Sequence, residues 1–333
     1  MPTFVKITLF FVVIAAVFYF DPLGVFKNTK KARMELKKKE IDFDTDTFIS
    51  YAKKGSPDIV TLFLEGGQKV DARNENGETA ISVAVKGGYP NTVGILLERK
   101  ANVTGRDKDG LPLIIVAAKI KDDDKAARII TALLNAGGDA NAKTDSNKTA
   151  LMFVAEDGKV KAAMALLTKG AEINAQDNNG YSALLAAVLS GKEPMVDLLV
   201  NKKANVNLRA RDNIPLILFA ARMGKTKIVE QLIDWGAYMD DVDPEGVSAL
   251  MAASDANQEE TVILLLSRGA NPNLADKKGR TAISMAAARN NVKVLDWLRK
   301  AGGGKPPVAP VPAPAQTNPP PVAVPRPAPA PAQ

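Results

Sequence analysis

The sequence predicts an all-α solenoid of about eight helix–turn–helix units, each followed by an extended finger. The main observation is a strict internal period. When the copies are aligned on the last residue of the finger, that residue falls at Gly77, Gly110, Asn147, Gly180, Asn213, Gly246 and Gly279, with spacings of 33, 37, 33, 33, 33 and 33 residues. A fixed period of this length indicates stacked repeats rather than several globular domains.

The content of one copy supports the same fold class. Residues 148–180 contain two short helical segments, TALMFVAEDG and KVKAAMALLTKG, and then the finger AEINAQDNNG. Isolated helices shorter than about 12–15 residues are marginal in water, so each pair must be stabilised by its neighbours. The inner helix of each copy is rich in alanine, which allows close approach between adjacent inner helices, and the outer helix carries larger aliphatic side chains.

A candidate membrane anchor precedes the repeats. Residues 7–20 are an unbroken apolar run, and reading back through Lys6 to Thr3 gives 18 residues, because a lysine near a helix end can extend its amine to the interface. The bulky residues before Asp21 offer no small-residue cleavage site. We therefore predict an uncleaved N-terminal transmembrane helix in residues 1–22, with a cleaved signal peptide as the alternative.

Residues 23–43 form a predicted basic juxtamembrane linker. Seven cations against Glu35 and Glu40 give residues 27–40 a net +5 of the chain's formal +7. Near an anionic leaflet each cation contributes about 1 kcal/mol of attraction, which makes this set a candidate membrane-surface site; a solvated helical linker is the alternative. The seven cations are Lys27, Lys30, Lys31, Arg33, Lys37, Lys38 and Lys39.

The same cations bear on the side of the membrane that holds the repeats. The positive-inside rule favours the cytoplasmic face for the repeats that follow a basic flank. Short hydrophobic N-terminal segments also export bacterial proteins, so the periplasmic face is the alternative.

The predicted repeat domain covers residues 44–304. At its ends the pattern changes in the manner of capping repeats, since Tyr51 replaces an inner-helix alanine in the first copy and the last copy has no finger. The copies span residues 44–77, 78–110, 111–147, 148–180, 181–213, 214–246, 247–279 and 280–304.

The third copy carries a four-residue insertion in the segment AAKIKDDDKAARII. Its three consecutive carboxylates, residues 122–124, lack the alternating ligand spacing, the glycine and the glutamate of an EF-hand loop. We predict that they form a solvated turn that caps a helix starting at Lys125.

Residues 305–333 form a predicted disordered tail. They include 12 prolines in 29 residues, with alanine, valine and glutamine between them. Such a composition cannot form a core and favours extended polyproline II segments. We predict a spacer, with a proline-rich ligand for another protein as the alternative.

Composition excludes several classes of chemistry. The chain has no Cys and no His, which removes disulfides, Cys/His zinc sites, thiol catalysis and imidazole acid–base chemistry. The segment Gly224-Lys225-Thr226 lacks the first glycine of a phosphate-binding loop, because Phe219 stands at that position. Residues 41–304 are net neutral, so no overall field favours nucleic acid. We predict no enzyme, no cofactor, no metal site and no small-molecule substrate.

The repeat resembles the ankyrin repeat over residues 45–302. The resemblance includes the period, the Asp-x-x-Gly finger tips and the Gly-Ala-x-x-Asn links of residues 170–174 and 269–273. The histidine of the family's Thr-Pro-Leu-His segment is absent from every copy, and most of its prolines are alanines. The finger tips are residues 107–110, 177–180, 243–246 and 276–279.

The resemblance implies a protein-binding scaffold, which is expected to be monomeric. Together with the predicted anchor, it indicates a membrane-anchored protein of bacterial type. Ankyrin stacks bind proteins through a concave surface made of the finger tips and the exposed side of the inner helices. In the central copies this surface carries apolar and arginine side chains, a composition typical of an interface centre. The alternative function is that of an exported accessory or protective protein that acts on an envelope enzyme or component. The alternative for these side chains is that they pack onto neighbouring repeats. The candidate residues are Leu111, Ile120, Tyr181, Leu189, Arg211, Ile214, Arg222 and Met223.

Overall fold

The computed structural model describes residues 25–302, which are helical throughout apart from turns, links and fingers. No strand occurs in this range, only isolated β-bridges within the fingers. The contacts divide the chain after Ala204 into two compact units, and each unit is described separately. The predicted all-α class is confirmed.

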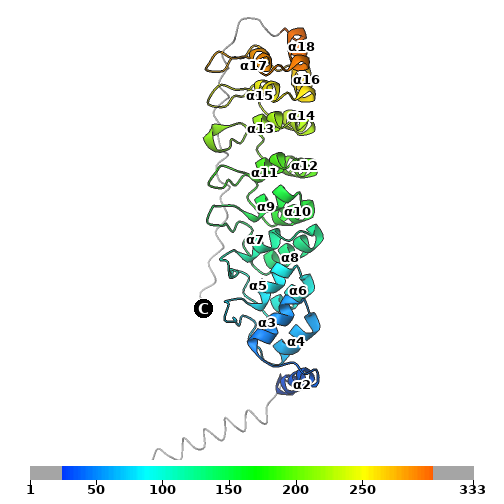
Figure 1. The fold of residues 1–333 in the computed structure, drawn as a ribbon. Coiled ribbons are helices and arrows are strands. Elements are labelled where there is room, and N and C mark those ends of the chain that lie inside the picture. The colour runs from blue at the N-terminus through cyan, green and yellow to red at the C-terminus, as the bar shows by residue number, and fades with distance from the viewer. Residues whose placement is uncertain (1–24, 303–333) are drawn as a thin grey trace, which may run out of the picture. The chain divides into compact units, whose positions relative to one another are not determined.

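The first unit contains one additional helix followed by five inner–outer pairs (Figure 1). Each inner helix packs against the inner helix of the next pair, and each outer helix packs against the next outer helix. The additional helix is α2 (Val25–Lys38). The pairs are α3 (Thr45–Lys53) with α4 (Pro57–Glu65), α5 (Ala80–Gly87) with α6 (Pro90–Glu98), α7 (Leu113–Ala118) with α8 (Asp123–Asn135), α9 (Ala150–Asp157) with α10 (Val160–Thr168), and α11 (Ala183–Leu189) with α12 (Glu193–Asn201).

The second unit repeats the arrangement with three pairs. Its inner helices stack in the order α13, α15, α17 and its outer helices in the order α14, α16, α18. A short 3-10 turn, η1 (Arg211–Asn213), forms the tip of the finger ahead of α13. The pairs are α13 (Leu216–Arg222) with α14 (Thr226–Asp234), α15 (Ala249–Asp255) with α16 (Glu259–Ser267), and α17 (Ala282–Ala288) with α18 (Val292–Lys300).

The alanines of the inner helices are at the centre of both stacks, as predicted. Ala84, Ala117, Ala155 and Ala187 in the first unit are fully buried, and so are Ala253 and Ala286 in the second. Because a larger side chain at these positions would force the helices apart in a close-packed interior, they are among the most restricted positions in the chain.

The fingers explain the Asp-x-x-Gly signal in the sequence. In the finger between α6 and α7, one carboxylate oxygen of Asp107 accepts from the backbone N–H of Asp109 at 3.0 Å and of Leu111 at 2.8 Å. Gly110 closes the turn with φ of 77°, a conformation that glycine adopts at little cost. A bridge between Arg106 and Pro112 then pairs the two sides of the finger.

Side-chain amides join the link of one repeat to the link of the next. Asn141 accepts from the backbone N–H of Glu172 at 2.7 Å and donates to the carbonyl oxygen of Gly170 at 3.1 Å. Asn207 makes the equivalent two bonds within the second unit. The asparagine of the Gly-Ala-x-x-Asn pattern therefore serves as a connection between successive repeats.

Thr104 stands where the register places this asparagine in the second repeat. Its hydroxyl donates to Asn102 at 2.8 Å, a bond within its own link. A hollow of about 490 Å³ lies beside it, against the link of the following repeat. The lining comprises residues 103–106, residues 112–114, Leu133, Gly138, Asp139 and residues 141–143. A threonine side chain is too short to bridge this space.

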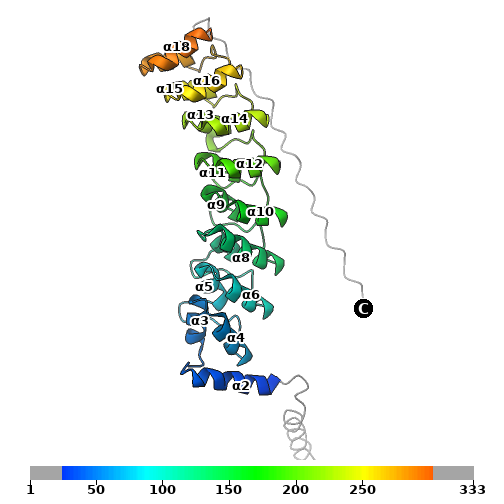
Figure 2. The same ribbon diagram turned by 90° about the vertical axis from the view of Figure 1, so that its right-hand side faces the viewer.

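The largest difference from the sequence-based expectation is at the N-terminal end. Part of the predicted linker, residues 25–38, forms helix α2, and its Ala32 and Leu36 are buried. The helix packs against α4, so it takes the place of the outer helix of an incomplete repeat (Figure 2). The stack therefore begins before residue 44. Such a helix covers the end of a solenoid that would otherwise expose apolar surface.

Two predicted segments lie outside the described residues: the anchor in residues 1–22 and the tail in residues 305–333. Within residues 25–302 no helix combines the length and the apolar character needed to cross a bilayer.

We expect Thr104→Asn to raise the free energy of unfolding by roughly 0.5–1.5 kcal/mol, since an amide there would join two links that a threonine leaves unjoined. The measurement is the chemical denaturation of the full chain. Thr104→Val is the matched control, because it removes the same hydroxyl without supplying an amide. Equal stability of the two variants would contradict the proposed role of the link asparagines.

Candidate protein-binding surface

Two of the predicted site residues, Leu111 and Ile120, share a hollow of about 240 Å³ in the first unit. Leu111 follows the finger tip and Ile120 follows α7. Ile120 also covers the preceding repeat, since its methyl group would lie 3.4 Å from a Cβ placed on Gly88. Both residues are half-buried. The full lining is Lys86, Asp107, Asp109, Leu111, Val116, Lys119 and Ile120.

Tyr181 and Leu189 share a second hollow, of about 120 Å³, at the equivalent place two repeats further along. Tyr181 has 38% of its surface exposed, whereas Leu189 is half-buried. The backbone N–H of Tyr181 donates to Asp177 at 2.9 Å, which positions the tyrosine directly after its finger. The full lining is Lys148, Met152, Glu156, Asp177, Tyr181, Ala186, Leu189 and Ser190.

A lysine–carboxylate pair borders each hollow. Lys86 pairs with Asp109 at 3.2 Å beside the first, and Lys148 pairs with Glu156 at 2.6 Å beside the second. These pairs are partly or largely exposed, so they add little stability. A partner that binds there would meet apolar side chains surrounded by charges of both signs.

The repeat between the two hollows presents an aromatic ring. Phe153 is half-buried, and the ammonium groups of Lys148 and Lys119 lie 4.4 Å and 5.8 Å from its ring centre. Both distances are within the range of a cation–π interaction. Sequence reasoning missed Phe153, which stands at a register position that holds Val116 and Ala186 in the neighbouring repeats.

The remaining predicted residues belong to the second unit. Arg211 lies in η1 at a finger tip and is exposed, as are Arg222 and Met223 at the end of α13. Met223 has 42% of its surface exposed, whereas Ile214 is half-buried. Sequence register therefore placed these side chains on fingers and inner-helix ends, where the structure has them.

The three carboxylates of the third repeat all bind groups of the same chain. Asp122 caps its own helix by accepting from the backbone N–H of Lys125 at 3.0 Å. Asp123 accepts from the backbone N–H groups of Lys161 at 3.0 Å and Ala162 at 2.9 Å, so it caps the next outer helix, α10. Asp124 pairs with the Lys161 ammonium at 2.6 Å.

One detail of the sequence-based expectation was wrong, because the helix begins at Asp123 rather than at Lys125. The insertion lengthens α8 by bringing part of the acidic run into its first turn, where carboxylates interact favourably with the helix dipole. Among residues 25–302, no group of three or more carboxylates is placed to hold a metal ion.

A buried lysine is a second feature that the sequence did not indicate. Lys159 is 4% exposed, and its ammonium donates to the carbonyl oxygen of Ala118 at 2.8 Å and to Asp157 at 2.5 Å. Ala118 ends the inner helix of the preceding repeat. Gln258 and Asn291 make the corresponding bond to inner-helix carbonyls in the second unit. Lys159 therefore serves as a connection between repeats.

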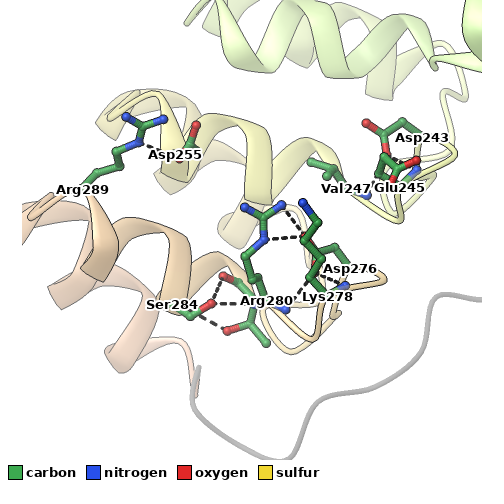
Figure 3. A network of polar contacts seen from close by, with 10 residues as sticks. Asp243, Glu245, Val247, Asp255, Asp276, Lys278, Arg280, Ser284 and Arg289 are labelled. Atoms are coloured by element: carbon green, nitrogen blue, oxygen red, sulfur yellow. Dashed lines mark hydrogen bonds and ion pairs between the residues drawn. The ribbon is translucent and has the colours of Figure 1, made fainter.

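The last finger of the second unit holds charged residues in a polar network (Figure 3). Burial raises the pKa of Asp276, but hydrogen bonds from the backbone and side chain of Arg280 and from the backbone of Lys278 outweigh it, and the pKa is held below its usual value. Arg289 pairs with Asp255 of the preceding repeat at 3.0 Å. The charges of Arg280 and Arg289 are thus partly neutralised by partners in the same unit.

The comparison with protein families agrees with this architecture. The family model described as ankyrin repeats (3 copies) matches residues 27–107, 48–131, 114–210 and 215–306 of the sequence. The chain therefore belongs to the ankyrin repeat family, whose repeats generally mediate protein–protein interaction. The first match begins inside α2, in agreement with the packing of that helix as part of the stack. No curated protein matches the chain.

We expect Asp123→Ala to lower the free energy of unfolding by about 1 kcal/mol, because two N–H groups at the start of α10 lose their acceptor. Asp124→Ala is the matched control: its ion pair is solvent-exposed, and we expect a change within about 0.5 kcal/mol. Denaturation of the full chain and hydrogen exchange of the α10 amides measure both effects. Equal losses from the two variants would refute the separate roles given to these neighbours.

Proposed function

We propose that this protein is a non-catalytic scaffold that binds a protein partner through its fingers and inner-helix ends. The observation that carries the proposal is the pair of hollows in the first unit. Both occupy the same place in the repeat, and both have apolar floors bordered by charged side chains. Apolar depressions with a polar rim are the usual composition of a protein interface.

The size of the hollows favours a protein over a small molecule. Their volumes of about 240 Å³ and 120 Å³ lie below the range of roughly 300–1,000 Å³ that is typical of ligand pockets. A partner that presents two apolar side chains to separate repeats would use both, and the charges around them would restrict its register.

The second unit has its own set of exposed side chains at the equivalent positions. Arg222 and Met223 stand side by side at the end of α13, and Arg211 projects from the finger before it. Arginine and methionine are enriched at interface centres, and arginine forms bidentate bonds with carboxylates. This composition supports an acidic segment in the partner.

We expect the double variant Tyr181→Glu, Met223→Glu to lose capture of the partner from cell extract while its helicity and melting temperature stay unchanged. A buried carboxylate at an interface would be costly, whereas both residues are partly exposed in the free chain. The measurement is affinity capture by the full chain followed by identification of the retained proteins.

The matched control for this experiment is Met164→Glu. Met164 has the same 38% exposure as Tyr181 but lies on the outer helix α10, away from the fingers. Retention of the same proteins by the double variant and by wild type would reject the surface. Loss of capture by the control as well would show that the effect is not confined to the proposed surface.

The second part of the proposed function is membrane anchoring by residues 1–22, with the repeats on the cytoplasmic face. The 18-residue segment that ends at Phe20 and the basic residues after it support this proposal. The alternative is an exported protein whose repeats act on an envelope component in the periplasm.

A topology reporter fused after Gly304 separates the two alternatives. We expect a fluorescent fusion to report a cytoplasmic repeat domain and a phosphatase fusion to be inactive, because that phosphatase needs an oxidising compartment. The reverse result would place the repeats outside. Recovery of the chain in the soluble fraction after cell breakage would reject the anchor on either side.

A further inference from the structure

Helix α2 has two faces with different contacts. One face is held against the stack, where Ala32 and Leu36 are buried. On the same side, the Arg33 guanidinium donates to the carbonyl oxygen of Gly66 at 2.7 Å and lies 4.4 Å from the ring centre of Phe43. Arg33 is therefore occupied in fixing the helix to the first repeat, although the sequence placed it among the membrane-surface cations.

The opposite face of α2 carries cations around an exposed apolar side chain. Lys30, Lys31, Met34, Glu35 and Lys38 line one shallow hollow of about 400 Å³. Met34 has 55% of its surface exposed. Glu35 pairs with Lys38 at 3.0 Å, so one of the three lysine charges is offset. The face as a whole remains basic, with a methionine at its centre.

We propose that this outward face of α2 binds the anionic surface of a lipid bilayer, with Met34 entering the interface between its lysines. The proposal rests on the membrane anchor proposed above. The lysines of this face would contact the lipid headgroups, and Arg33 would not.

The chain length between anchor and helix supports a bilayer as the occupant. Five residue steps separate Phe20 from Val25, and they span at most about 18 Å even when fully extended. A helix tied so closely to a membrane segment lies within reach of the headgroups. Because charges are largely screened beyond about 8–10 Å at physiological salt, its lysines attract anionic lipids only when the helix lies against the headgroups, which this short connection permits.

The composition of the face favours lipid over nucleic acid. Phosphate backbones are bound by cations and polar groups, and an exposed methionine adds nothing to that contact. An amphipathic helix at a bilayer surface uses both cations for the headgroups and an apolar side chain for the acyl boundary. Because the other face of α2 is docked on α4, contact with the bilayer would also hold the first repeat at the membrane.

The test uses the absence of cysteine from the chain. Met34→Cys introduces a unique thiol that is labelled with an environment-sensitive fluorophore in the full chain. The labelled protein is incorporated into nanodiscs of phosphatidylcholine alone or of phosphatidylcholine with phosphatidylglycerol. We expect a blue shift of the probe only in the anionic discs. The shift should disappear at about 1 M salt, where the screening length falls to about 3 Å.

Two matched controls accompany this measurement. Met164→Cys places the same probe on the exposed methionine of α10, where no shift is expected. Replacing Lys30, Lys31 and Lys38 by glutamine should weaken docking by about fivefold per lysine removed. The same change at three exposed lysines of the links, Lys69, Lys100 and Lys169, removes equal charge and should leave the shift intact.

Several outcomes would overturn the proposal. A chain that enters anionic discs without a shift at position 34 would reject docking by α2 and leave the anchor intact. A chain that associates with neither kind of disc would reject both the anchor and the docking face. A shift produced by duplex DNA in solution and absent in anionic discs would assign the face to nucleic acid.

Discussion

The fold depends on one constraint: no helix within residues 25–302 can bury its apolar surface alone. The inner helices contain six to nine residues, fewer than an isolated helix needs to be stable in water. Their stability comes from contact with the preceding and following copies, and alanine at the contact positions permits the required approach. Each further bond between repeats, whether from Asn141, Asp123 or Lys159, reinforces contacts that stacking has already formed.

The same constraint makes the end of the first stack a distinct problem. A terminal repeat has a neighbour on one side only, so its outer face must be covered or made polar. Helix α2 covers this face with Ala32 and Leu36 and presents lysines on its other side. Residues 25–38, which the sequence predicts to be a charged linker, thus belong to the hydrophobic packing of the domain. The way the helix packs also determines which of its cations remain exposed.

The side chains at the fingers and inner-helix ends differ between copies, unlike the alanines at the centre of the stacks. Leu111, Phe153 and Tyr181 differ from the residues at the same register positions in neighbouring repeats. The result in the first unit is a series of dissimilar local surfaces, with two hollows and an intervening aromatic ring under two ammonium groups. Specificity in a scaffold of this kind resides in such differences, because the repeated backbone is the same in every copy.

The sequence by itself determined the class of fold, the register of the copies and the side chains that face outward at fingers and helix ends. These properties follow from a period and from local turn chemistry, such as an Asp that binds two N–H groups of its own finger. Tertiary structure alone decided the docking of α2, the capping of α10 by Asp123 and the burial of Lys159. Each of these depends on atoms from different repeats, and a periodic pattern specifies which positions are equivalent without specifying which side chains meet across the interface.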